Sequence, residues 1–322
     1  MKELTTSLAR LLPGSGKGAI RALVVALLAF EIAAPCMAAD QAPVVAHDAS
    51  PQRSAGGGAP LTLPKDVRVP VYEPGPTPLR PGERLAYRVS WIGIPAATAT
   101  VTLNADGPDS RQWTAQGWIT TDRLIDLLFR MRDYVREDFD QISYDPHDVF
   151  IRQDEKRRLS LYTATFDNGS HVVTAIKRHR DHSEIHRFGG GKALGPFSAA
   201  ALALSQRFEV GQRYVFDVFP GCNRYVFSFY IDGREKLRTA LGDFETFRVI
   251  PSVLYASNPA IFKEARRVVL WISADPRRLP LRLEASTFIG TVRADLIRIE
   301  EPDVLRPAAK VVLDRSLDNA NP

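Results

Sequence analysis

The sequence predicts a mainly β protein, built as an antiparallel sheet with one or two short helices. The first observation is alternation, because apolar and polar side chains change places residue by residue along many short segments between residues 82 and 300. That is the period of a half-buried strand. The second is the spacing of turn signals such as Asp106-Gly107, Asp232-Gly233 and Asp275-Pro276, which recur about every ten residues. Short strands with frequent turns between them predict antiparallel pairing.

Five segments show the alternation most clearly. Each places apolar side chains on one face, and four of them place polar or charged ones on the other. The fifth, Tyr225–Ile231, carries bulky residues on both faces, as if both were covered. The expected strands are Leu85–Trp91, Trp113–Ile119, Tyr225–Ile231, Leu281–Ala285 and Val292–Leu296, with a Thr- and Val-rich strand at Ala96–Leu103.

A first short helix is expected after Thr121-Asp122. These two polar residues are good N-cap candidates, and the residues that follow alternate irregularly in a way that does not suit a strand. The helix would carry Leu124, Leu127 and Leu128.

A second helix is expected near the middle of the β pattern. Residues Phe197–Phe208 are rich in alanine and leucine, which favour helix. Ser198 is the expected N-cap, and Gly211 follows the end.

The first 39 residues have the order of a secretory signal peptide. Residues 1–21 are polar with four basic side chains, residues 22–34 are mostly apolar, and small residues follow. Cleavage is expected after Ala38, with Ala39 as the alternative. The apolar run is shorter than the roughly 20 residues of a spanning helix. An uncleaved anchor is the other alternative. Export places the protein in the periplasm, with membrane association as an option.

Two further boundaries follow from composition. Residues 40–81 are rich in Pro, Gly, Ala and Ser, and this composition predicts a disordered linker. The antiparallel β domain then spans residues 82–300. Residues 301–322 are polar and contain proline, and a flexible tail is expected there.

Charge and cysteine content argue against a nucleic-acid-binding surface and against an intrachain disulfide. The chain of 322 residues has a net charge of +5, and without residues 1–39 it keeps 38 basic and 35 acidic residues. These are interspersed, so a nucleic-acid-binding surface is not predicted. Cys36 lies in the predicted signal, which leaves Cys222 without a disulfide partner. Cys222 is therefore expected to be a small buried apolar residue.

No catalytic residue, cofactor site or metal site is predicted, and the protein is not expected to be an enzyme. The chain lacks G-x-S-x-G, and it lacks a G-x-G-x-x-G that follows a strand and opens a helix. His179, His182 and His186 come closest to a metal-ligand set. In one strand, however, His179 and His182 would point to opposite faces, and nearby basic residues would repel a cation. A polar hairpin is expected there.

Four segments follow one another in a characteristic order. They are GERLAYRVSWIGIPAATATVTL (Gly82–Leu103), LIDLLFRMRDYVREDFD (Leu124–Asp140), FSAAALALSQRFEVGQRYVFDVF (Phe197–Phe219) and WISADPRRLPLRLEASTFIGTVRADL (Trp271–Leu296). This order resembles the domain-of-unknown-function 3108 family of exported Gram-negative bacterial proteins. The closing segment is the most specific, with a strand that begins at Trp271, then Asp275, Pro280 and Gly290. The chain departs from the family pattern at Phe197, where an acidic residue is expected before Ser198.

The resemblance implies an envelope location and a curved antiparallel sheet, either an open barrel or sandwich-like. It brings no catalytic residues. Trp91 and Trp271 are expected to be core aromatics, Asp275 and Gly290 turn residues, and Pro280 a residue at a strand start or edge.

A curved sheet can enclose a cavity, so the expected function is binding of an apolar or lipid-like envelope molecule in a β cavity. The alternative is a structural or protein-interaction module of the periplasm with no small ligand. An open apolar cavity would favour the first hypothesis. A packed interior with an exposed apolar patch would favour the second.

Overall fold

The structure is a computed structural model, and it describes residues 60–105, 107, 110–156, 158–179, 182–256, 265–287 and 290–301. The predicted signal peptide with both cleavage positions, Ala38 and Ala39, lies outside the described residues. So do residues 40–59 of the predicted linker and residues 302–322 of the predicted tail.

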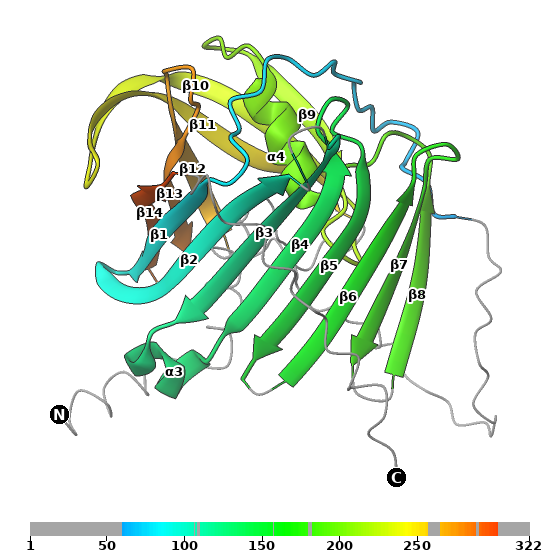
Figure 1. The fold of residues 1–322 in the computed structure, drawn as a ribbon, viewed down its shortest axis with the longest axis horizontal. Coiled ribbons are helices and arrows are strands. Elements are labelled where there is room, and N and C mark those ends of the chain that lie inside the picture. Colours follow the sequence, from blue (N-terminus) through cyan, green and yellow to red (C-terminus); the bar gives the residue numbers. More distant parts are fainter. Residues whose placement is uncertain are drawn as a thin grey trace.

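In this part of the chain, fourteen strands and two helices follow one another (Figure 1). The helices are α3 (Arg123–Phe129) and α4 (Pro196–Ser205). The strands are β1 (Arg84–Trp91), β2 (Ile94–Ala105), β3 (Gln112–Thr121), β4 (Arg132–Asp140), β5 (Pro146–Glu155), β6 (Arg158–Asp167), β7 (Val172–His179), β8 (His182–Gly189), β9 (Arg213–Val218), β10 (Tyr225–Thr239), β11 (Gly242–Ala256), β12 (Ala265–Ser273), β13 (Pro280–Thr287) and β14 (Gly290–Glu300).

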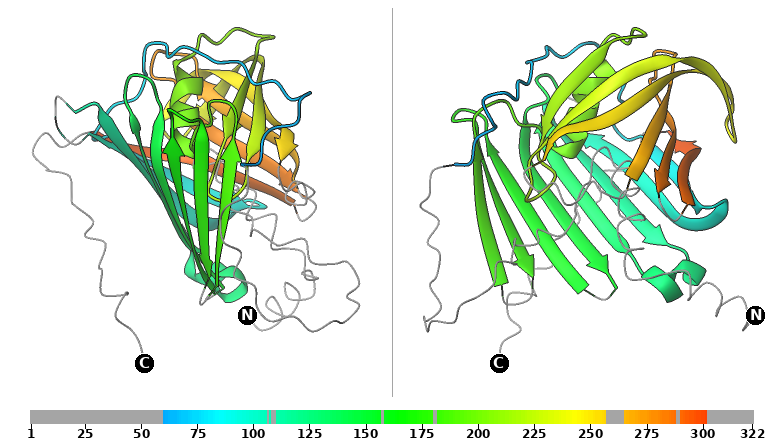
Figure 2. Two further views of the ribbon diagram at one scale, coloured as in Figure 1. Left: turned by 90° about the vertical axis from the view of Figure 1, so that its right-hand side faces the viewer. Right: turned by 180° about the vertical axis from the view of Figure 1, so that it is seen from behind.

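The strands form one antiparallel sheet, as the sequence predicts. Its order is β8-β7-β6-β5-β4-β3-β2-β1-β14-β13-β12-β11-β10-β9, so β1 and β14 are neighbours at the centre and β8 and β9 are the two edges. Nearly every strand pairs with its neighbour in sequence, which is what short turns between strands favour. The β10–β11 pair is the longest ribbon, and it arches away from the other strands when the molecule is seen from behind (Figure 2).

The sheet is curved, and its two edges meet at one end without pairing directly. Leu194, just after β8, forms a parallel bridge with Val218 at the end of β9. Phe188 of β8 packs edge-on against Phe219, with ring centroids 4.5 Å apart. The two edges are therefore joined only by this short contact region. In a closed barrel, the two edge strands would pair along their length.

Burial explains why the alternation predicted the strands. On β3, for example, Trp113, Ala115, Gly117 and Ile119 are buried, and the residues between them are only partly buried. The buried side chains lie on the face that packs against α4, and we call this the inner face. Residues Tyr225–Phe229 at the start of β10 are buried on both faces, in agreement with their bulky pattern.

The second helix begins earlier than predicted and is shorter. Gly195, not Ser198, is its N-cap, and the helix ends at Ser205 instead of Phe208. Ser198 sits one turn inside, where its Oγ accepts a hydrogen bond from the Gly195 N–H (2.9 Å). The sequence argument missed this because Pro196 favours the first helical position, which moves the cap one residue before it.

Residues 60–81 form a strap that runs past α4 to β1 (blue in Figure 1). The Leu61 N–H donates to Arg187 O on β8, and the Gly75 N–H donates to Ser205 Oγ at the end of α4. The Tyr72 hydroxyl accepts a hydrogen bond from the Val215 N–H of β9 (3.0 Å). Residues 60–81 of the predicted linker therefore pack against the rest of the protein. A Pro- and Gly-rich composition opposes regular strands, but it does not prevent contact with the core.

Candidate functional site

The inner face at the end where the sheet edges meet is filled by the protein's own chain. α4 packs there between β4 and β9, and its residues Phe197, Ala199, Ala201 and Leu202 are all buried. The segment after β9 fills the neighbouring space, since a side chain at Gly221 would contact Ile151 and Tyr162. The buried apolar residues of α4 are therefore in contact with other protein atoms.

One carboxylate is buried in this packing. Glu137 of β4 is fully buried, and its two oxygens accept hydrogen bonds from the N–H groups of Phe197 (2.5 Å) and Ser198 (3.1 Å) in the first turn of α4. Burial raises the pKa of Glu137 to about 7, while the hydrogen bonds from Ser198 and Phe197 oppose the rise. Glu137 of β4 thus caps the N-terminus of α4, which is a structural role for a carboxylate.

The Glu137 carboxylate can lie close to the backbone at the start of α4 because residue 195 is a glycine. A Cβ built at Gly195 would overlap the Glu137 carboxylate. In chain order the two residues lie 58 positions apart. No local sequence signal connects them, although an acidic residue on the apolar face of a strand was visible in Asp133, Val135, Glu137 and Phe139.

A second buried charge ties the two sheet edges together. Arg224, which is 3% exposed, donates from Nε and Nη2 to Asp217 of β9 at 3.0 and 2.5 Å. Its Nη1 donates to Gly189 O (2.8 Å), and Nη2 also donates to Gly190 O. Gly190 has φ +80°, a conformation that glycine adopts without strain. This arginine therefore links β9 to the end of β8 and has a structural role.

The three histidines of the sequence hypothesis lie in the hairpin that the sequence predicts, on two strands and not on one. His179 ends β7 and His182 begins β8, and they are cross-strand partners. Residues opposite each other in a ladder share a face, so all three, with His186, lie on the inner face. Glu184 lies 3.4 Å from both His182 and His186. Among the described residues, no group of three or more His, Cys, Asp or Glu side chains could hold a metal ion.

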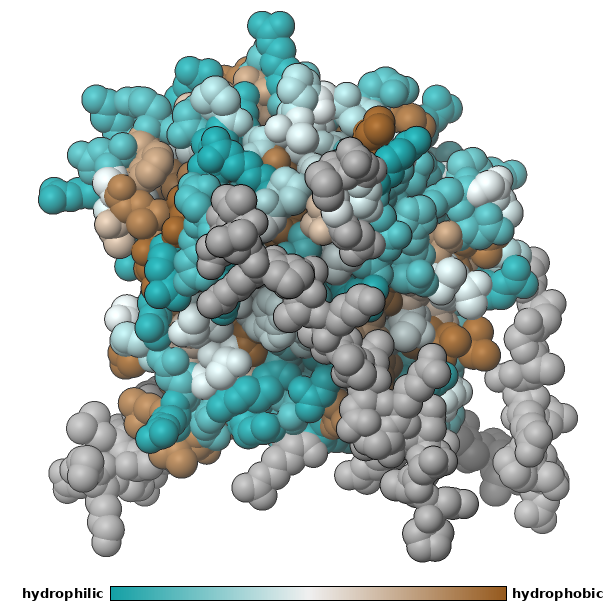
Figure 3. All heavy atoms as spheres, viewed as in Figure 1, coloured by the Kyte–Doolittle hydropathy of each residue, from teal (hydrophilic) through white to brown (hydrophobic). Residues whose placement is uncertain are grey.

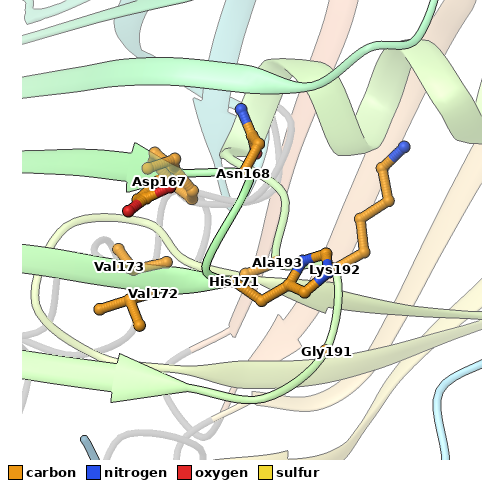
Figure 4. Close-up of a pocket in the computed structure, with 9 residues that line it drawn as sticks. Asp167, Asn168, His171, Val172, Val173, Gly191, Lys192 and Ala193 are labelled. Carbon is orange, nitrogen blue, oxygen red and sulfur yellow. The ribbon is translucent and has the colours of Figure 1, made fainter.

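A small pocket lies between the β6–β7 turn and the segment after β8 (Figure 4). Asp167, Asn168, His171 and Lys192 line it together with apolar residues. The volume open to the centre of a water molecule is about 10 Å³ in this pocket, which is about enough for a single water. Lys192 lies 2.7 Å from Asp145. This pocket is too small for an acyl chain.

The resemblance residues mainly hold the sheet. Trp91 is buried in the core, and Trp271 is partly buried with its indole N–H donating to Glu235. Asp275 Oδ1 accepts hydrogen bonds within its own turn, from Ser273 and Arg277. Gly290 has φ +116°, and a Cβ there would lie 2.9 Å from Ile92. Cys222 is buried.

The opposite end of the sheet carries exposed apolar side chains, and we call these the α3 rim: Ile92, Ile94, Leu124, Leu127 and Leu159. Leu124 and Leu127 are 66% and 77% exposed, and Ile92 in the β1–β2 turn is 60% exposed. The Asp122 N–H bonds to Ala96 O (2.9 Å), which holds the start of α3 beside the start of β2. Figure 3 shows apolar residues at the lower left, where α3 lies in Figure 1.

The first predicted helix is present as α3 and carries the three expected leucines. Its core contacts come from Ile125 and Phe129, while Leu124 and Leu127 are exposed to solvent. The two buried residues are four positions apart and so lie on one face of the helix. The exposed leucines are therefore available for contact with another molecule.

Charges around the α3 rim are net basic. Three carboxylates near the helix are paired, Asp122 with Arg88, Asp126 with Arg132, and Asp154 with Arg130. Arg123 and Arg158 are exposed, and neither forms an ion pair with a carboxylate of the described residues, although buried Glu155 is the cross-strand partner of Arg158. The rim thus combines apolar side chains with two exposed arginines.

Comparison with known proteins gives a family and two solved structures. The model of the family described as "Protein of unknown function (DUF3108)" matches residues 86–297. The crystal structure of a β-barrel-like protein of domain of unknown function DUF1849 from Brucella abortus is similar, with 10% identity and a TM-score of 0.45 over 68% of this chain and 96% of that one. A protein with a YmcC-like fold from Bacteroides fragilis matches with 10% identity and a TM-score of 0.28 over 71% and 99%. No curated protein matches.

None of the helices in the described part of the chain is both long and apolar enough to span a membrane.

Proposed function

We propose that this chain, which belongs to the DUF3108 family of proteins of unknown function, is an exported binding protein without catalytic activity that contacts lipid through the α3 rim. The observation that carries the proposal is the exposure of Leu124 and Leu127 beside Arg123, which is also exposed. Apolar residues flanked by basic ones are the pattern of a surface that lies in the lipid interface. The ligand class is the lipid-like molecule that the sequence predicts.

The packed described interior and the exposed α3 rim form the pattern that favours an interaction module over binding in a cavity, and the basic residues beside the rim are our reason for proposing lipid as its partner. α4 and the segment after β9 occupy the inner face where a cavity would be expected. An acyl chain there would have to displace Phe197 or Phe219, which are buried against other aromatic or aliphatic side chains. The α3 rim needs no displacement, since its side chains already face solvent.

The expected affinity is modest. Four rim side chains are about half to three-quarters exposed: Ile92, Ile94, Leu124 and Leu127. Burying all four in lipid would contribute about 5 kcal/mol to the free energy of binding. Two arginines at an anionic surface would add about 1 kcal/mol each. A total of about 7 kcal/mol corresponds to a Kd of about 10 µM. Binding is therefore expected to be reversible and to depend on salt.

The test is flotation of the mature protein with vesicles. We expect binding to phosphatidylglycerol–phosphatidylethanolamine vesicles, weaker binding to phosphatidylcholine, and release as salt rises. The Leu124→Ser/Leu127→Ser double variant should bind about 100-fold more weakly. Ile142→Ser is the matched control, because Ile142 is 58% exposed but lies in the β4–β5 turn at the other end of the sheet.

Two outcomes would redirect the proposal. If wild type does not float with any vesicle, the α3 rim is not a lipid surface, and the rim becomes the candidate contact of a protein-interaction module. If native mass spectrometry of protein from the periplasm finds one acyl-chain molecule that the double variant retains, the ligand lies inside the sheet.

A further inference from the structure

A cluster of arginine and aromatic side chains lies at the end of the sheet opposite α3. Arg278 is in the turn between β12 and β13, which is orange at the top of Figure 1, and its φ is +47°. Arg234 of β10 is the cross-strand partner of Phe247 on β11. Phe208, after α4, packs edge-on against Phe247 with ring centroids 5.5 Å apart. Three separate parts of the chain therefore meet at this cluster.

The two guanidinium groups converge on the same ring. The Arg234 guanidinium carbon is 4.4 Å from the Phe247 centroid, and that of Arg278 is 4.9 Å from the centroids of both Phe247 and Phe208. Cation–π contact of this kind stabilises each arginine. It does not remove the repulsion between two like charges brought together in a partly buried place.

Arg278 has no ion-pair partner in the described part of the chain, which sets it apart. Every other arginine that is buried or half-buried in the described residues has a carboxylate oxygen within 4.0 Å. Arg278 Nη1 is buried and has no hydrogen-bond partner. The nearest carboxylate in electrostatic reach is Asp275, whose Oδ1 is already bonded by Ser273 and Arg277.

The electrostatics agree with an uncompensated positive site. Burial lowers the pKa of Arg278, and the charge of Arg234 lowers it further. A buried N–H donor without an acceptor also costs free energy. Both costs would be removed by an oxyanion beside the two guanidinium groups, because guanidinium binds oxyanions in a two-pronged fashion.

We propose that Arg278 and Arg234 form a binding site for a phosphoryl group, either of free phosphate or of a lipid headgroup. The buried Nη1 of Arg278 supplies a donor that is already desolvated, and Arg234, which is exposed, supplies the second charge. The site lies at the other end of the sheet from the α3 rim and is independent of the proposed lipid contact there.

The experiment is a titration of the mature protein with inorganic phosphate, followed by thermal denaturation and calorimetry. Sodium chloride at matched ionic strength controls for general salt effects. We expect a saturable rise in Tm with a Kd of about 1 mM, and at least about tenfold weaker binding in Arg278→Gln and in Arg234→Gln. Arg238→Gln is the matched control, since Arg238 is exposed on the same strand.

The variants also separate a binding role from a structural one. Without phosphate, Arg234→Gln should keep or raise Tm, because it removes the repulsion; a purely structural arginine would lower it. Arg278→Lys keeps the charge but loses the fork, and it should fold and still bind phosphate more weakly. The Leu124→Ser/Leu127→Ser protein should respond to phosphate like wild type, whatever its behaviour with vesicles.

The source of the phosphoryl group is resolved by a second titration with short-chain phosphatidylglycerol. Binding of phosphate alone at full strength indicates a free anion. Binding of the lipid only, lost in Arg278→Gln, indicates a headgroup. If neither probe binds, or if Arg278→Gln binds both like wild type, the site does not exist.

Discussion

The two helices in the described part of this protein lie at opposite ends of one sheet, and their apolar side chains have opposite surroundings. α4 is enclosed, with apolar side chains buried on most of its surface and a carboxylate from β4 at its N-terminus. α3 buries only Ile125 and Phe129 and leaves two leucines in solvent. Both contain several leucine or alanine residues, but α3 also carries Arg123 and Asp126, whereas α4 has no charged residue. The difference teaches that the apolar residues of α4 stabilise the fold, whereas Leu124 and Leu127 of α3 remain available for binding.

Polar groups follow the same division. At the α4 end, Glu137, Asp217 and Arg224 are buried, and their hydrogen bonds cross between distant strands. At the α3 end the ion pairs are partly exposed, and such pairs contribute little to stability. Substitutions at the two ends should therefore differ sharply in their effect on the free energy of unfolding.

The largest expected effect is that of Arg224→Ala. Removing this arginine leaves Asp217 buried without its partner and frees two carbonyl groups of the β8 end, which should cost about 3–5 kcal/mol. Urea denaturation measures it. A loss below about 1 kcal/mol would mean that the link between the two edges is not needed for stability. Arg238→Ala, exposed on β10, is the control.

The pH dependence of Glu137 gives the next largest effect. Its pKa is raised from 4.5 to about 7 by burial, so the folded protein holds a proton that the unfolded chain releases. This group's stabilisation is therefore complete below about pH 4.5 and is lost as the pH rises through 7, by up to about 3 kcal/mol. Glu137→Gln should flatten the slope of unfolding free energy between about pH 5 and 8, whereas exposed Glu245→Gln should not. An unchanged slope in Glu137→Gln would contradict this assignment.

Gly195→Ala should destabilise by about 1–3 kcal/mol, because its Cβ would overlap the Glu137 carboxylate that caps α4. The measurement is the urea midpoint. Gly233→Ala is the matched control, since nothing lies within 4 Å of a Cβ there. Equal losses in the two variants would show that backbone freedom, and not the approach of Glu137, is the reason for glycine at position 195.

The smallest effect on stability is expected at the α3 rim. Leu124→Ser/Leu127→Ser should change the unfolding free energy by less than about 1 kcal/mol, since both side chains are mostly in solvent. The same variant should lose vesicle binding, so the two measurements together separate binding from folding. A large loss of stability would show that these leucines pack against residues outside the described part of the chain.

Much of the fold could be predicted from local pattern. Leu85–Trp91, Trp113–Ile119 and Tyr225–Ile231 lie within β1, β3 and β10, because a strand with one buried face must alternate. Both helices are present near their expected places. The ends were less well predicted, and Pro196 rather than Ser198 determined where α4 begins.

What the sequence determined by itself is therefore a β protein with two short helices, since hydrophobic period and turn residues act over a few positions. Only the tertiary structure decided that β8 and β9 become edges, that Glu137 meets Gly195, and that Arg234 meets Arg278. These are contacts between residues 44 to 58 positions apart. Strand register and the curvature of the whole sheet decide which residues meet, and neither can be predicted from a local sequence pattern.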